Sequence, residues 1–192
     1  MNLRHRIADA AMEAFRASGL GFTMADVAGR LRISKKTIYK EYESKEKLLI
    51  GMLEQGYAEI HAQKKAILES GESLREKLRR VVIALPDEYR TLDFRRLEHI
   101  GEKYPKAARA LKQQLTEGWE PTLALIREGI ESGQLRPFNV SVFRLMVIGS
   151  IESFLNSGAL QEEEISYEAA LEAMMDILMD GLSAENTERK TL

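Results

Sequence analysis

The sequence predicts an all-α protein of about nine helices. Its 192 residues include only four prolines, and apolar residues recur at three- and four-residue spacing rather than in the alternation of strands. Thr23, Ser34, Ser44 and Ser73 stand before such segments, where helix N-caps are expected. Hydrophobic residues make up 44% of the chain and charged residues 30%, so the chain can bury a core.

The first helix is expected from about Leu3 to Ser18. Five apolar residues share one of its faces at helical spacing, namely Ile7, Ala10, Ala11, Ala14 and Phe15. Gly19 and Gly21 follow, and we expect them to end the helix.

Two short helices joined by a tight turn are expected next. Thr23 caps the first, and Asp26 three residues later completes a capping-box-like pair. Arg32 and Ile33 form the turn. The buried stripe of this helix is Met24, Val27, Ala28 and Leu31.

The second short helix follows the Ser34 cap and covers about residues 35–41. Ser44 caps the fourth helix of the chain, which is long and reaches about Glu69.

Further helices fill the rest of the chain. Pro86 lies near the end of one of them, Pro105 suits the first position of another, and a Gly118–Pro121 break interrupts that one. The expected ranges are residues 74–89, 93–100, 105–132, 140–155 and 166–182. The acidic run of residues 162–164 is expected to be a solvated loop.

The last two helices are apolar around most of their circumference. Such a pair favours a four-helix bundle made by two copies of the chain, although two helices central to one core give the same pattern. The residues expected at this dimer interface are Phe143, Val147, Ile151, Phe154, Met174 and Leu178.

The charge is distributed unevenly. Residues 1–50 hold ten lysines and arginines against six acids, a net charge of +4, whereas residues 51–192 hold eighteen against twenty-four, a net charge of −6. This asymmetry suggests that the first fifty residues meet a polyanion, and chance patterning is the alternative.

The two short helices and their turn have the format of a helix-turn-helix DNA reader. The capped start of the second short helix offers free N–H groups to a phosphate, and Thr37 offers a hydroxyl and a methyl that suit a phosphate or a thymine methyl. Ile38 and Tyr42 lie on the opposite face and are expected to pack. Taken singly, the lysines read as solvated and Tyr39 as packing, but their coincidence on one helix favours DNA contact. The expected DNA-contacting residues are Thr23, Ser34, Lys35, Lys36, Thr37, Tyr39, Lys40 and Lys45.

The segment from about Arg6 to Met52 resembles the DNA-binding domain of the TetR (tetracycline repressor-like) family of bacterial transcriptional regulators. The similarity covers about a quarter of the chain, and the remainder is similar in helix count and length rather than in motif. The resemblance implies a DNA-binding domain at residues 1–47 and an effector-binding and dimerisation domain at residues 48–192. Its motifs here are Ala10-Ala11 through Phe15 and Gly19, Thr23 to Leu31, Ile33-Ser34, Thr37-Ile38-Tyr39 and Ser44-Lys45-Glu46-Lys47-Leu48.

Two residues depart from the family pattern. Arg32 occupies a turn position that is commonly glycine, so we expect either a different turn conformation or an added charge near DNA. Glu41 replaces an aromatic residue or histidine, and an acid there repels phosphate unless it pairs with Lys40 or Lys45.

The resemblance also implies a homodimeric repressor that binds a palindromic double-stranded DNA operator and is released by a small-molecule effector, with no further cofactor. Aromatic and flexible residues of the body helices suit an apolar pocket, although core packing explains each of them singly. The expected pocket residues are Tyr89, Phe94, His99, Tyr104, Trp119, Phe143 and Met146.

An enzyme and a helical interaction module are the two alternative classes of protein. An enzyme is disfavoured, because the chain has no cysteine, its three histidines follow no metal-ligand spacing, and it contains no phosphate loop or dinucleotide fingerprint. A helical interaction module with impaired DNA binding is the other alternative, motivated by Glu41. No segment has the length of a membrane span or the apolar core of a signal peptide, so we expect a cytoplasmic protein without a membrane partner.

Overall fold

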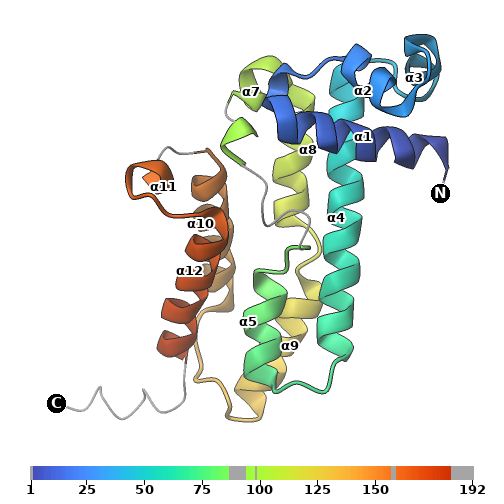
Figure 1. Ribbon diagram of the computed structural model, residues 1–192. Coiled ribbons are helices and arrows are strands. Elements are labelled where there is room, and N and C mark those ends of the chain that lie inside the picture. The colour runs from blue at the N-terminus through green and yellow to red at the C-terminus, as the bar shows by residue number, and fades with distance from the viewer. Residues whose placement is uncertain (1, 87–93, 98, 157–158, 183–192) are drawn as a thin grey trace. The chain divides into compact units, whose positions relative to one another are not determined.

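The computed structural model describes residues 2–86, 94–97, 99–156 and 159–182 (Figure 1). Every regular element in these ranges is a helix, which confirms the predicted all-α class. Nine of the described helices have seven or more residues. None of the described helices combines the length and hydropathy that a bilayer crossing requires.

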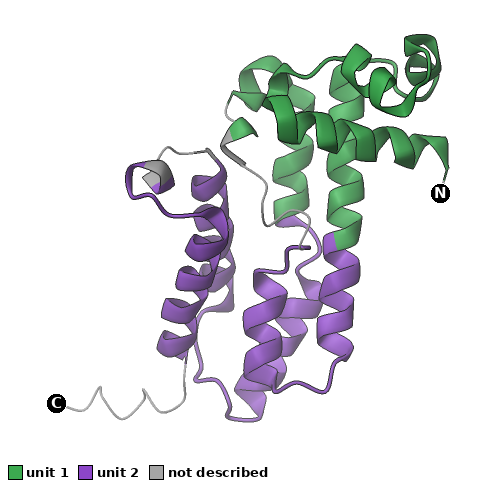
Figure 2. Ribbon diagram, in the orientation of Figure 1, with its two compact units in different colours: residues 1–59, 91–115 green, residues 60–90, 116–192 purple. Residues whose placement is uncertain are grey.

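The chain divides into two compact units (Figure 2). Unit 1 contains residues 1–59 and 91–115, and unit 2 contains residues 60–90 and 116–192. Helix α4 (Lys45–Glu69) is continuous and contributes residues to both units. Unit 1 is therefore larger than the DNA-binding domain expected at residues 1–47. That boundary concerns function, and it stays a prediction.

The first helices of unit 1 have the predicted bounds. They are α1 (Leu3–Ser18), α2 (Met24–Leu31) and α3 (Lys35–Glu41), with the 3-10 helix η1 (Gly19–Gly21) after α1. The predicted apolar face of α1 is buried, and so are Met24, Val27 and Ala28 of α2. Ile38 of α3 and Leu48 and Leu49 of α4 are buried as well. This shared core packs α1, α2 and α3 against the start of α4.

The later part of unit 1 differs from the expected single helix at residues 93–100. The structure has a 3-10 helix, η2 (Phe94–Leu97), and a single helical turn, α7 (Ile100–Lys103). His99 lies between them with φ 66°, a left-handed conformation that a continuous helix does not allow. Helix α8 (Pro105–Thr116) follows and begins at Pro105 as predicted.

Unit 2 contains α5 (Leu74–Val82), which ends earlier than the expected residue 89. In a longer helix the ring of Pro86 meets the carbonyl of Val82, four residues before it, and Pro86 also disfavours helical geometry at Leu85. Residues 87–89 lie outside the described part of the chain.

The remaining helices of unit 2 are α9 (Glu120–Glu131), α10 (Val140–Asn156), α11 (Ala159–Glu162) and α12 (Tyr167–Leu182). The predicted break before α9 is present, and Gly118 there has φ 71°. Helix α11 was not expected. It includes Glu162 of the acidic run, whereas Glu163 and Glu164 lie in an exposed turn.

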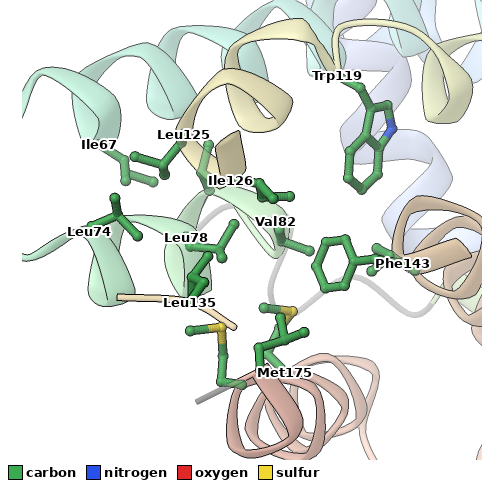
Figure 3. Close-up of a cluster of buried hydrophobic side chains, with 14 of the residues drawn as sticks. Ile67, Leu74, Leu78, Val82, Trp119, Leu125, Ile126, Leu135, Phe143 and Met175 are labelled. Carbon is green, nitrogen blue, oxygen red and sulfur yellow. The ribbon is translucent and has the colours of Figure 1, made fainter. Parts of the chain in front are cut away.

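One apolar cluster forms the core of unit 2 (Figure 3). It draws Ile67 from α4, Leu78 from α5, Ile126 from α9, Val147 from α10 and Met175 from α12. Each such side chain stabilises the fold by roughly 1.5–3 kcal/mol when fully buried. The cluster therefore joins all the long helices of unit 2.

Polar contacts also fix α12 within unit 2. The Arg79 guanidinium of α5 lies 3.0 Å from the Glu172 carboxylate and 2.9 Å from that of Asp176. At the C-terminal end of α12, Arg136 donates its backbone N–H to Leu182 O at 3.2 Å and its Nε–H to Gly181 O at 2.6 Å.

Candidate nucleic-acid interface and effector region

The start of α2 is fixed by a complete capping box. The Thr23 backbone N–H donates to the Asp26 carboxylate at 2.7 Å, and the Asp26 backbone N–H donates to Thr23 Oγ1 at 3.2 Å. The Thr23 backbone N–H, and then the Thr23 hydroxyl that donates to the same carboxylate at 2.9 Å, lower the pKa of Asp26 below its usual 3.8. The predicted capping pair is confirmed, and Thr23 remains on the exposed surface.

The turn between α2 and α3 places Arg32 in the left-handed region, with φ 53° and ψ 41°. Backbone N–H groups of Arg32 and Ile33 donate to Gly29 O at 3.2 Å and Ala28 O at 3.1 Å, which closes the end of α2. The turn thus has the conformation that glycine favours, although an arginine occupies it. Its exposed side chain adds a positive charge beside α3.

Helix α3 presents a basic face and buries the opposite one. Ser34 Oγ accepts from the Thr37 backbone N–H at 3.1 Å and lies 2.9 Å from Thr37 Oγ1, so the cap is formed. Ile38 is fully buried, and the ring of Tyr42 after the helix is also buried, as predicted. Lys35, Lys36 and Lys40 are exposed, and Tyr39 is 48% exposed.

Arg4 of α1 holds the end of α3 through Tyr42. Its guanidinium lies 4.2 Å from the centre of the Tyr42 ring and donates to Glu41 O at 2.6 Å, while Tyr42 Oη donates to Arg4 O at 3.3 Å. Within the described residues Glu41 forms no ion pair with Lys40 or Lys45. The orientation of α3 therefore depends on α1, a contact that the sequence analysis did not predict.

Lys45 does not have the position that a phosphate clamp requires. Its ammonium donates to Leu20 O at 2.6 Å and to Phe22 O, and it lies 4.4 Å from the centre of the Phe22 ring and 5.3 Å from that of Tyr104. These two carbonyls and two rings bind the ammonium inside unit 1. The ammonium thus has its partners within unit 1, and a phosphate contact of Lys45 stays a prediction.

The predicted pocket residues are divided between the two units. His99 and Tyr104 belong to unit 1, where the His99 ring is exposed and lies 3.3 Å from the Glu102 carboxylate. Trp119 and Phe143 are buried in the unit 2 cluster, and Met146 is 52% exposed. Tyr89 and the side chain of Phe94 lie outside the described residues.

The predicted dimer residues also divide. Phe143 and Val147 are buried in the core of unit 2, so their side chains are covered within one subunit. The other four, Ile151, Phe154, Met174 and Leu178, are half-buried. The exposed apolar residues of α10 and α12 are instead Val142, Leu145, Met146 and Ile177.

Three basic side chains of unit 2 form a cluster that the sequence analysis did not single out. His61 and Lys64 come from α4 and Arg144 from α10. The His61 ring approaches Gly118, Arg144 donates to Thr116 O, and the charge of Lys64 acts on His61. Two basic residues three apart on a long helix read as solvated from sequence alone, so no local signal identified them. In the described part of the chain, no group of three His, Asp or Glu side chains suits a metal ion.

A capped α2, a tight turn and an anchored α3 with an exposed basic face define a helix-turn-helix DNA-binding protein. The family model for bacterial regulatory proteins of the tetR family matches residues 7–52. An HTH-type transcriptional regulator of Bacillus subtilis (strain 168), YvaF, is 31% identical over 169 residues, 87% of this chain and 88% of that protein. The chain belongs to the TetR family of bacterial transcriptional regulators.

Solved structures share the fold. FadR from Bacillus subtilis, in complex with stearoyl-CoA, has a TM-score of 0.67 at 18% identity, over 93% of this chain and 98% of that one. A TetR-family regulator from Cytophaga hutchinsonii has a TM-score of 0.71 at 15% identity, over 94% of both chains.

Proposed function

We propose that this regulator is a repressor that binds a palindromic operator as a homodimer and is released by a small-molecule effector held in residues 48–192. The observation that carries the DNA-binding part is the two-sided character of α3. One side is locked by Ile38 and Tyr42, so the other presents its lysines and Tyr39 at a fixed orientation.

The residues of α3 are proposed to make different contacts with DNA. The Ser34 cap leaves N–H groups of α3 for a phosphate, and Lys35, Lys36 and Lys40 neutralise neighbouring phosphates. Thr37 contacts a phosphate or a thymine methyl, and Tyr39 uses its ring and hydroxyl at the backbone. Thr23 at the start of α2 and the backbone N–H of Lys45 at the start of α4 complete the phosphate contacts.

Dimerisation is proposed through the exposed apolar face of α10 and α12. Val142, Leu145 and Met146 follow one another at helical spacing on α10, and Ile177 is 74% exposed on α12. Isolated exposed apolar residues are ordinary, but a stripe on α10, with a further exposed isoleucine on α12, suits an isologous contact with a second copy. The half-buried Ile151, Phe154, Met174 and Leu178 border this face.

Helix α4 is the proposed route from effector to DNA. Its first turn holds unit 1 together, because Lys45 binds two carbonyls before α2 and Glu46 Oε1 accepts from the Lys106 backbone N–H at 2.8 Å. The same helix continues into unit 2 without a break. An effector that binds one position of α4 more tightly than another shifts operator affinity, and such couplings are typically about 1–3 kcal/mol.

Duplex DNA binding measured against salt tests this function. Fluorescence anisotropy with an operator selected from random duplexes should show an affinity that falls steeply as salt rises, because phosphate contacts release counterions. Lys35→Ala should weaken binding about tenfold and reduce the salt slope by about 1, as for one lost phosphate contact. Lys103→Ala on α7 is the matched control, since Lys103 is exposed in unit 1 but lies outside the helix-turn-helix. Salt-insensitive or absent binding would favour the interaction module instead.

A further inference from the structure

The basic cluster of unit 2 (His61, Lys64 and Arg144) is assembled around one segment. Arg144 Nη2 donates to Thr116 O at 3.0 Å, and the His61 ring occupies the space that a β-carbon on Gly118 needs. Because Thr116 and Gly118 are two residues apart, at most about 7 Å of chain separates these two contacts. Lys64 follows His61 by three residues on α4. Burial first, and then the positive charge of Lys64, lower the pKa of the imidazole. Lys64 is therefore close enough to act on His61, whose ring adjoins the segment that Arg144 contacts.

Neither Lys64 nor Arg144 is paired with an acidic side chain among the described residues. No ion pair involves Lys64 or Arg144 there, and burial alone lowers the pKa of the Lys64 ammonium below its usual 10.5. Arg144 Nε is buried and donates to no acceptor, and on the same turn of α4 the buried Gln63 Oε1 has no donor. Buried charges and polar atoms without partners destabilise a fold, so their presence indicates that something else pairs with them.

A carboxylate or phosphate fits these unpaired groups. An acidic oxygen accepts from both an ammonium and a guanidinium Nε, and such charge-assisted hydrogen bonds are the strongest of their kind. The neighbouring Trp119 belongs with Phe143 to the apolar cluster (Figure 3). The basic groups at Thr116 and Gly118 therefore lie next to apolar surroundings.

We propose that unit 2 binds an effector bearing a carboxylate or phosphate, and that Lys64 and Arg144 receive this acidic group. The inference rests on the proposed effector role of unit 2, and it adds the chemical class of the molecule. His61 borders the site and orders the segment of residues 116–119 against α4.

Binding of matched probes to the full-length protein tests the proposal. The probes are decanoate and inorganic phosphate as acids and decanol as the neutral control, at constant ionic strength. Trp119 is the only tryptophan of the chain, so its fluorescence reports binding next to Gly118. We expect a saturable change with at least one acid, at an affinity at least tenfold higher than with decanol. Decanoate binding would point to a carboxylate and phosphate binding to a phosphoryl group. Equal affinity for decanol, or no saturable binding of either acid, would overturn the proposal.

Charge-removing variants locate the site. Lys64→Met and Arg144→Met should each weaken binding of the acid at least tenfold. Lys65→Met is the matched control, since Lys65 is the adjacent, exposed residue of α4, 3.8 Å from the Glu69 carboxylate, and its loss should leave binding unchanged. Equal losses in all three variants, or none in the first two, would contradict the assignment.

The stability of the ligand-free protein gives an independent readout. If the Lys64 ammonium serves to bind an acidic ligand, it has no partner in the ligand-free protein. Lys64→Met should then raise the melting temperature of the ligand-free protein, because a buried unpaired charge is removed. A lower melting temperature would show that the ammonium supports the fold, and the proposal would fail. The ligand-binding and melting measurements contain no DNA and therefore test only the acid site. If the acid binds but does not change operator affinity in the anisotropy assay, the repressor mechanism fails while the acid site stands.

Discussion

At the scale of single residues, Gly51 of α4 makes room for the ring of Tyr42, which anchors the end of α3. A β-carbon at this position of α4 lies 2.5 Å from an edge carbon of the Tyr42 ring, closer than real contacts allow. That ring is buried, accepts the Arg4 guanidinium on its face and follows directly after α3. The absence of a side chain at residue 51 therefore allows the contact between α1, α3 and α4.

Gly51→Ala should destabilise the protein although alanine favours helices. Overpacking of a buried ring costs about 1–3 kcal/mol, and the better helix propensity of alanine returns up to about 1 kcal/mol. We expect a net loss of about 1–2 kcal/mol in the free energy of unfolding, measured by urea titration.

Gly29→Ala in α2 is the control for this prediction. Nothing lies within 4 Å of a β-carbon at Gly29, so only the propensity gain of about 0.5–1 kcal/mol is expected. Equal changes in stability for the two variants would show that Tyr42 moves aside freely.

His61 should make stability depend on pH. Burial first, and then the charge of Lys64, lower the pKa of His61 below 6.5. As the pH falls through 6.5, the unfolded chain binds a proton that the folded chain refuses, so the free energy of unfolding decreases. Above that pH both forms are neutral and the contribution is constant. Urea midpoints at pH 7.5 and 5.5 should therefore differ less in His61→Gln than in the parent protein. A difference of the same size would assign the pH dependence to other groups.

Residue exposure was only partly predictable from sequence. The packing of Ile38 and Tyr42 follows from their four-residue spacing, a local property of one helix. The partners of Lys45 and the cluster around Lys64 depend on segments far away in the chain, such as Tyr104 and Arg144. A lysine that donates inward and one that faces water have the same sequence signature.

At the scale of elements, caps made the starts of α2, α3 and α4 predictable. Ser34 bonds back to Thr37, and Ser44 Oγ likewise accepts from the Lys47 backbone N–H at 3.2 Å, so each start is defined by local chemistry. The end of α5 was wrong because the effect of Pro86 extends back four residues, to Val82.

If the exposed apolar face of α10 and α12 joins two copies of the chain, a charge placed on it should prevent dimerisation. Ile177→Glu places a charge at a residue that is 74% exposed in the isolated chain, so the fold should be unaffected. If this face joins two copies, the buried charge should yield monomers in sedimentation at micromolar concentration.

Ile165→Glu controls for the added charge. Ile165 is also exposed but lies before α12, outside the stripe, so this variant should sediment as the parent protein does. A dimer that persists in Ile177→Glu would remove the proposed interface.

At the scale of the whole molecule, α4 is the element that gives the two units a common part. Its first turn contacts the residues before α2 and the start of α8, and its last turns enter the unit 2 core through Ile67. His61 and Lys64 of the basic cluster lie on the portion of α4 between them. An acid bound at Lys64 would thus act on the same helix whose first residue adjoins the DNA-reading surface.

Hydroxyl-radical footprinting of the full-length protein on its selected operator tests the central claim most directly, that two copies read DNA through α3. Two-fold helix-turn-helix proteins contact half-sites one helical turn apart, about 34–36 Å. We therefore predict two symmetric protected half-sites at about that spacing or a multiple of it, and the loss of both together in Lys35→Ala at moderate salt. A single protected half-site, or protection that survives in Lys35→Ala, would contradict the account.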